Sequence, residues 1–186
     1  MDTETETYNA RELRQYRPDA FKLAHTRYAD RVTGDPWGYE IRDSLKLFVM
    51  ASGLPNRGNF EIRLIPGNMM GKALRIASWL SDSDMYPFLA LKGDAAESWF
   101  NATMAPHEFH GYIADWTYLT QAKANLLQCI RDGMTVQEGL EYVAEIFQAA
   151  LDGEWDYATS PDGFLDWAEE NDARFNADGD VIGGAA

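Results

Sequence analysis

The acidic residues of this chain are distributed unevenly, and this limits how its last third can fold. Residues 132–186 contain fourteen Asp and Glu residues and a single base, Arg174, whereas residues 1–131 contain sixteen acids and fifteen bases. No Lys or Arg lies between Asp132 and Ala173, so these acids have no basic partner one turn away on their own helix. The segment must therefore expose its acids or pack them against bases from elsewhere in the chain.

The charge imbalance also restricts the ligands of this segment. Its negative field disfavours direct binding of nucleic acid, anionic membranes and acidic substrates, and favours a partner protein with a basic groove. Six bases are enriched near the start of the chain, namely Arg11, Arg14, Arg17, Lys22, Arg27 and Arg31. We expect them to dock against the acidic C-terminal helices; an anion site and a self-association surface are the alternatives.

Length and composition predict one folded domain over residues 1–186, because 46% hydrophobic and 13% aromatic residues suffice for a core. The single cysteine, Cys129, excludes an intramolecular disulfide and favours a reducing cytoplasm. The first ten residues lack the basic and apolar regions of a signal peptide. No apolar run approaches the ~20 residues that cross a bilayer. We therefore expect a cytoplasmic protein without a membrane partner.

Residues 10–53 carry the periodicity of N-terminal helices. The predicted helices cover residues 10–16, 18–32 and 37–52. Asn9 is a capping residue for the first, Pro18 begins the second, and Gly53 ends the third. Apolar side chains recur at helical spacing, at Phe21, Ala24, Tyr28 and Val32 in the second helix and at Ile41, Leu45, Phe48 and Val49 in the third.

The hydrophobic period changes in the middle of the chain. Residues 60–64 alternate between apolar and charged side chains, which is typical of a half-buried strand. Weaker strand candidates are residues 73–80, 86–91, 98–104 and 109–119, the first of which also fits a helix. The predicted fold class is therefore α+β. An antiparallel sheet of four or five strands, over about 60–119, is flanked by the N-terminal helices and by an acidic helical segment over 120–186.

The acidic segment shows clear helix boundaries. The predicted helices cover residues 121–132, 135–151 and about 161–171. Thr135 and Glu138 form a capping box at the start of the second, and Gly153 follows its end. Residues 175–182 are predicted to form a turn or small hairpin, with Gly179 in a left-handed conformation.

The helix over 135–151 separates its acids from its apolar residues. At about 100° per residue, the apolar sector contains Val136, Leu140, Val143, Ala144, Phe147 and Leu151. A narrow sector away from it contains Glu138, Glu141, Glu145 and Asp152, which we call the acidic stripe. The other candidate partner-binding residues of the segment are Glu154, Asp156, Asp162, Asp166, Glu169 and Glu170.

Motifs for catalysis, metals or cofactors are weak, so no catalytic residue, metal ligand or cofactor is predicted. His107 and His110 lack the i, i+4 spacing of helical metal ligands. Cys129 lies among apolar residues and is expected to be a buried structural thiol. Residues 176–180 lack the glutamate that completes a calcium loop. Loop carboxylates that could do acid–base or metal work are Asp82, Asp84, Asp94, Glu97 and Glu108.

Short motifs at both ends of the chain share a pattern with other proteins. Residues 154–160 (EWDYATS) precede an E-E-N segment at 169–171 and an F-N-A-D-G segment at 175–179. Near the start, residues 10–14 (ARELR) precede a P-D-A-F segment. These ends resemble a family of uncharacterised tailed-bacteriophage proteins, whereas residues 65–73 depart from that family's middle. The resemblance implies a phage origin and a bacterial host cell, and implies no reaction.

The acidic segment and the resemblance together predict a non-enzymatic protein. It would block a host nucleic-acid-binding factor, as anti-restriction and anti-CRISPR proteins do, through a surface that mimics DNA. The partner would be a host protein with a basic groove. One alternative is a small carboxylate- or metal-dependent hydrolase or nuclease that uses His107 or His110. The other is a dimeric structural or assembly protein joined through an aromatic sheet face of Tyr112, Trp116 and Tyr118.

Overall fold

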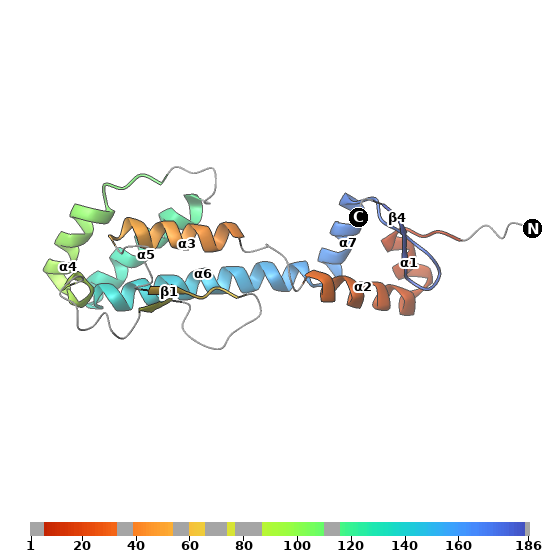
Figure 1. Cartoon of the computed structure of the whole chain (residues 1–186), viewed down its shortest axis with the longest axis horizontal. Helices are drawn as coiled ribbons and strands as arrows, with labels where there is room; N and C mark the ends of the chain where they lie inside the picture. Colours follow the sequence, from red (N-terminus) through yellow and green to blue (C-terminus); the bar gives the residue numbers. More distant parts are fainter. Residues whose placement is uncertain are drawn as a thin grey trace, which may run out of the picture. The chain divides into compact units, whose positions relative to one another are not determined.

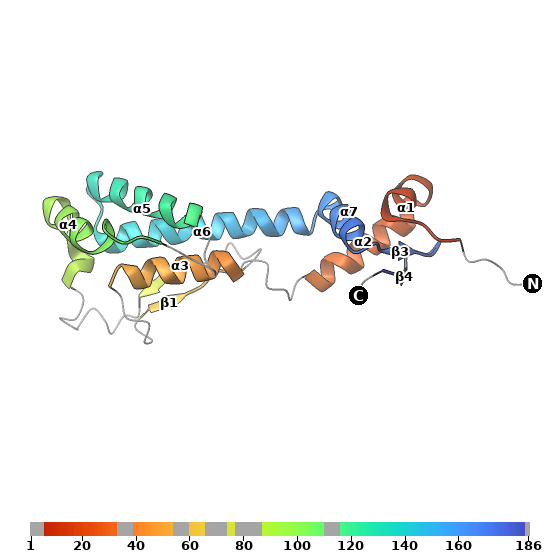
Figure 2. The same ribbon diagram turned by 90° about the horizontal axis from the view of Figure 1, so that it is seen from above.

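The structure is a computed structural model that describes residues 6–32, 39–53, 60–65, 74–76, 87–109 and 116–184. The chain divides into two compact units. We call residues Met1–Pro36 with Glu154–Ala186 the terminal unit, and residues Trp37–Gly153 the central unit. The first and last parts of the chain lie side by side in the terminal unit (Figures 1 and 2). Each unit has its own hydrophobic core.

Short helices form most of the terminal unit. They are α1 (Ala10–Tyr16), α2 (Pro18–Val32), the last residues of α6 (Val136–Ala158) and α7 (Pro161–Glu170). The capping box of α1 is complete, because Asn9 Oδ1 accepts from Glu12 N–H and the Glu12 carboxylate accepts from Asn9 N–H. At α7, the Ser160 hydroxyl accepts from Gly163 N–H. The predicted starts of these helices are confirmed.

A small antiparallel ribbon completes the terminal unit. β3 (Arg174–Phe175) pairs with β4 (Val181–Gly183). On its other side, Phe175 exchanges two backbone hydrogen bonds with Tyr8, both 2.9 Å long. The predicted hairpin is therefore confirmed, and the residues just before α1 extend it.

The turn of this ribbon is held by one asparagine. Asn176 Oδ1 accepts from the N–H groups of Asp178 and Asp180, at 3.0 and 2.9 Å. Gly179 has φ of +81°, as predicted. A Cβ at Gly179 would overlap the carbonyl oxygen of Ala20 in α2, so the turn packs on α2 only because this residue is glycine.

The core of the terminal unit is centred on Phe164. Its ring lies 5.4 Å from that of Phe21, 5.2 Å from that of Tyr28 and 5.8 Å from that of Phe175, between centroids. The buried set is Ala10, Leu13, Phe21, Ala24, Tyr28, Val32, Ala158, Phe164, Leu165, Ala168, Ala173 and Phe175. The apolar face predicted for α2 is confirmed within this set.

The central unit is also mainly helical. Its described elements are α3 (Tyr39–Ala51), β1 (Phe60–Ile62), β2 (Leu74–Ile76), the 3₁₀ turn η2 (Pro87–Ala90), α4 (Gly93–Trp99), the π-helical turn η3 (Phe100–Met104), α5 (Trp116–Arg131) and most of α6. The antiparallel pair β1–β2 places Phe60 opposite Ile76 and Ile62 opposite Leu74. Gly53 follows α3 with φ of +90°, which confirms the predicted end of that helix.

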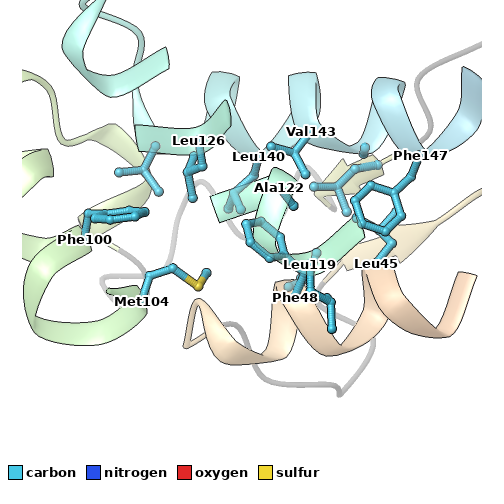
Figure 3. Packing of buried hydrophobic residues seen from close by; sticks show 14 of the residues in the cluster. Leu45, Phe48, Phe100, Met104, Leu119, Ala122, Leu126, Leu140, Val143 and Phe147 are labelled. Carbon is cyan, nitrogen blue, oxygen red and sulfur yellow. The ribbon is translucent and has the colours of Figure 1, made fainter. Parts of the chain in front are cut away.

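Side chains from three helices meet in the core of the central unit. Figure 3 shows Leu45 and Phe48 of α3 converging with Leu119 of α5 and with Leu140 and Phe147 of α6. Phe100 and Met104 of η3 enter the same core. The four apolar residues predicted to face inward from α3 are all buried: Ile41, Leu45, Phe48 and Val49.

The predicted sheet of four or five strands is wrong. Among the described residues, strand pairing is limited to the two ribbons β1–β2 and β3–β4. The strands predicted over 86–91 and 98–104 are the turns η2 and η3, and the end of the 109–119 candidate is the first turn of α5. Phe100 and Met104 are four residues apart and both buried, so a helical spacing in this stretch was misread as a strand. Residues 110–115 lie outside the described residues.

Helix α6 does not end before Gly153, as predicted, but continues to Ala158. An interior glycine costs a helix only about 1 kcal/mol relative to alanine. Leu151 and Ala158, on the two sides of Gly153, are both buried, and this burial outweighs the glycine penalty.

The boundaries of the two units differ from those of the predicted segments. Residues 10–53 and residues 120–186 are each divided between the terminal unit and the central unit. The single domain over 1–186 stays a prediction. Within the described residues, no helix is both long enough and apolar enough to cross a membrane.

Candidate functional site

The acidic stripe of α6 lies on the side of the helix that faces away from the core. The buried side consists of Val136, Leu140, Val143, Ala144, Phe147 and Leu151. On the other side, Glu138 and Glu145 are exposed, and Glu141 and Asp152 are half-buried. The orientation of the acids thus follows from the packing of the apolar residues, since the two sets lie on opposite sides of the helix.

The first acid of the stripe also begins the helix. The Glu138 carboxylate accepts hydrogen bonds from the N–H and hydroxyl groups of Thr135, each 2.8 Å long. The Thr135 hydroxyl in turn accepts from Glu138 N–H at 3.1 Å. This is the predicted capping box. Glu138 therefore has a structural role, which any test of its binding role must keep separate.

A shallow hollow of about 470 Å³ lies beside the first turns of the stripe. It is lined by Lys92, Asp132, Gly133, Met134, Glu138, Glu141, Tyr142 and Glu145. Four carboxylates and one ammonium group leave it with a net negative charge. Tyr142 adds an aromatic ring that is 45% exposed. A hollow with these groups suits a Lys or Arg side chain, which can pair with a carboxylate and lie over the ring.

Neutral amide groups orient two acids of the stripe. Gln137 Nε2 donates to Glu141 Oε1 at 3.3 Å, and Gln148 Nε2 donates to Asp152 Oδ1 at 3.0 Å. An amide donor fixes the position of a carboxylate but leaves its negative charge in place. These two contacts therefore order the stripe without neutralising it.

The acids of α7 have different surroundings, because arginines of α1 contact them. Arg11 Nη2 lies 2.9 Å from Glu169 Oε2, and Arg14 Nη1 lies 3.5 Å from Asp162 Oδ1. The hydrogen bond with Glu169 raises the pKa of the Arg11 guanidinium. Two of the predicted partner-binding acids are thus paired within the chain, and the predicted docking of N-terminal bases against C-terminal acids is observed.

The ribbon turn and the end of α6 contribute one further ion pair and one hydrogen bond to a carboxylate. Arg27 of α2 pairs with Asp180 in the turn. The Tyr157 hydroxyl donates to Asp166, and this hydrogen bond raises the pKa of Tyr157 above its ordinary value. Asp166 is therefore also engaged within the terminal unit.

All six predicted site residues of the terminal unit are exposed, including Glu154, Asp156 and Glu170. None of these three forms an ion pair with a Lys or Arg that the structure describes. None of the three lines the hollow that Glu138, Glu141 and Glu145 of the stripe share.

The histidines and the cysteine have structural surroundings. His107 is exposed, and its ring contacts that of Phe109 edge-on at 4.6 Å. His25 Nε2 forms a 2.7 Å hydrogen bond with the carbonyl oxygen of Thr159. Cys129 is buried as predicted, and burial raises the pKa of its thiol. His110 lies outside the described residues.

The described residues contain no group of three His, Cys, Asp or Glu side chains that could share a metal ion. Two of the carboxylates expected in loops, Asp94 and Glu97, lie instead in α4. Glu97 accepts a hydrogen bond from Arg131 at 3.2 Å. Asp82 and Asp84 lie outside the described ranges.

The sequence alone missed Lys92, Met134 and Tyr142 as neighbours of the stripe. Tyr142 follows Glu141 directly and lies on the same side of α6, so its position on a helical projection could have identified it. Lys92 precedes α4 and is forty-six positions before Glu138, so only the tertiary structure brings it to the hollow.

Comparison of the chain with protein-family models, with curated proteins and with solved structures finds no match. The resemblance to phage proteins therefore stays a prediction, and the function must be argued from the chain's own residues.

Proposed function

We propose that this chain is a non-enzymatic binding protein that occupies a basic groove of a bacterial nucleic-acid-binding protein and blocks it. The observation that carries the proposal is the acidic stripe of α6 beside its hollow. Its acids project from a single helix, and the hollow combines Glu138, Glu141 and Glu145 with the exposed ring of Tyr142. Complementary charge of this kind increases the association rate and selects a basic partner.

Contacts within the terminal unit reduce the number of acids that we assign to partner binding. Asp162, Asp166 and Glu169 already have partners within the chain. We assign partner binding mainly to Glu138, Glu141 and Glu145, because they line one hollow, with Asp152 further along the same helix. The exposed acids Glu154, Asp156 and Glu170 contribute long-range attraction, which salt screens at distances beyond about 8 Å.

Competition with DNA provides the test. The tagged full chain captures proteins from a bacterial lysate at physiological ionic strength, and double-stranded DNA or high salt is then added. We expect a basic, nucleic-acid-binding protein to be captured and to be released by DNA, because both ligands would use the same groove. Mass spectrometry identifies the proteins that each wash releases.

A matched pair of variants locates the surface. The triple variant Glu138→Gln, Glu141→Gln and Glu145→Gln removes three charges from the stripe, while glutamine at position 138 preserves a capping box. Its control, Glu154→Gln, Asp156→Asn and Glu170→Gln, removes three exposed charges from the terminal unit. Loss of capture in the first variant only supports the proposal. Equal capture by both, or capture that DNA does not reverse, would contradict it.

The two alternatives have weaker support. The described histidines contact backbone or aromatic groups, and no observed arrangement favours a hydrolase. The aromatic sheet face expected for a dimer is absent where the structure describes it, because Trp116 and Tyr118 belong to α5. Tyr118 packs on Phe147 inside the central unit; Tyr112 lies outside the described residues.

A further inference from the structure

A cleft of about 400 Å³ in the terminal unit combines aromatic walls with a charged rim. Its walls come from α2, α7 and the ribbon, and include Tyr28, Val32, Phe164, Trp167, Phe175 and Val181. Arg27, Arg31 and Asp180 lie around it. This volume falls within the range of small-molecule sites, which are mostly apolar and have a few polar groups that orient the ligand.

The aromatic wall is preformed. The rings of Tyr28 and Trp167 lie 4.8 Å apart between centroids and are inclined by 36°. Phe164 packs behind both, at 5.2 Å from Tyr28 and 5.9 Å from Trp167. Trp167 is half-buried, so part of its indole remains available on the cleft side. A planar aromatic ring in the cleft would therefore meet an aromatic wall with Trp167 as its most accessible ring.

The rim carries a cation that pairs with no described carboxylate. Arg27 is paired with Asp180. Arg31, one turn further along α2, is exposed and forms no ion pair with any carboxylate that the structure describes. The terminal unit contains sixteen acids and only seven bases. The Arg31 guanidinium is therefore available to pair with an anion from outside the chain.

We propose that this cleft binds a small planar aromatic carboxylate, with the ring against Trp167 and the carboxylate on Arg31. A guanidinium group can donate two parallel hydrogen bonds to a carboxylate, which fixes the orientation of the ligand as well as its charge. The inference is independent of the proposed function, because it uses no residue of the acidic stripe.

Two probes that differ only in charge test the inference. 2-Naphthoate and its neutral amide, 2-naphthamide, are titrated into the full chain, and binding is followed by calorimetry and by backbone amide NMR. We expect saturable one-site binding of 2-naphthoate, with shifts at cleft residues of α2 and α7. The amide should bind about tenfold more weakly, because it lacks the charge-assisted pair with Arg31.

Three variants assign the contacts. Arg31→Gln should reduce 2-naphthoate binding about tenfold, to the level of the amide. Lys22→Gln removes the same charge from the opposite side of α2 and should change nothing. Val181→Phe adds volume at an exposed wall position and should weaken both probes. Absence of saturable binding at millimolar probe, equal binding of the two probes, or binding that Arg31→Gln leaves intact would overturn the inference.

Discussion

The acids of α7 and of α6 come from the same base-poor segment, yet the fold treats them differently. On α7, Glu169 contacts Arg11, which lies 158 positions earlier in the chain. On α6, Glu138 and Glu145 border a shallow hollow that also contains other acids and Lys92. A local lack of bases is therefore a poor guide to ion pairing, because arginines from a distant part of the chain contact acids of α7. Binding is best sought among the acids of the stripe.

The largest effect that we expect is a loss of stability when a glycine of α7, rather than a glycine of α6, is replaced by alanine. An added Cβ at Gly163 of α7 would overlap the carbonyl oxygen of Tyr157 and lie 2.9 Å from that of Ala158. Backbone cannot move aside as easily as a side chain can. Gly163→Ala should therefore lower the free energy of unfolding by about 2 kcal/mol, as measured by denaturant titration.

Two glycines of α6 provide the controls for Gly163. At Gly139 the obstructing atom, 2.7 Å away, is the end of the Leu126 side chain, so Gly139→Ala should change stability by less than about 1 kcal/mol. Gly153 has open space around it, and Gly153→Ala should stabilise α6 by up to about 1 kcal/mol. If Gly163→Ala lowers the free energy of unfolding no more than Gly139→Ala does, backbone atoms at position 163 obstruct a Cβ no more than the Leu126 side chain does at position 139, and the prediction is wrong.

The second prediction separates structure from binding within the stripe. Glu138→Ala removes the reciprocal hydrogen bonds with Thr135 and should cost about 1 kcal/mol of unfolding free energy. Glu138→Gln keeps an acceptor and should cost less than half of that. Chemical denaturation of the two variants measures the difference. Equal losses would mean that the charge of Glu138, and not its capping bond, stabilises the helix.

The third prediction reverses one charge in each unit. Glu169→Lys places an ammonium group beside Arg11 and should lower the melting temperature by a small amount. Glu145→Lys reduces repulsion among the acids of the stripe and should not lower it. The difference should shrink at high salt, because exposed charges are screened. A loss of stability in Glu145→Lys larger than that in Glu169→Lys would reverse the comparison of the two helices.

The smallest effect concerns acid titration of the terminal unit. Hydrogen bonds from Asn176 and Arg27 hold the pKa of Asp180 below its usual value. A carboxylate with a lowered pKa in the folded state stabilises the protein above its unfolded pKa, and this contribution is lost as the pH falls through the folded value. Melting temperatures between about pH 5 and pH 3 should therefore fall slightly more in the wild type than in Asp180→Asn. Arg27→Gln should reduce this acid sensitivity in the same way.

Local sequence patterns predicted the helix starts and their inward faces well. Asn9, Thr135 and Ser160 each cap a helix, because a side-chain oxygen next to free N–H groups is a local interaction. The apolar spacing of Phe21, Tyr28 and their neighbours identified a buried face. The middle of the chain was misassigned, because short apolar runs fit both strand and helix. Phe100 and Met104 are buried together only because α4 continues into η3.

The acidic stripe itself could be found from the sequence, since the 3.6-residue period of the helix separates Glu138, Glu141 and Glu145 from Leu140 and Phe147. The hollow beside the stripe could not be found from the sequence, because Lys92, which lines it, precedes α4 and is distant from α6 in the chain. The pairing of Glu169 with Arg11 was expected only in general terms, as a docking of oppositely charged segments. The choice of partners depends on how α1 and α7 pack.

By itself, the sequence determined the starts of α1, α2, α6 and α7, the buried faces of α2, α3 and α6, and the position of the acidic stripe, because these depend on neighbours within a few residues. The tertiary structure alone decided which acids are paired, how the two ends of the chain form one unit, and where Trp167 and Arg31 meet around a cleft. Those features depend on contacts between residues more than a hundred positions apart, and no local pattern encodes the geometry that brings such residues together.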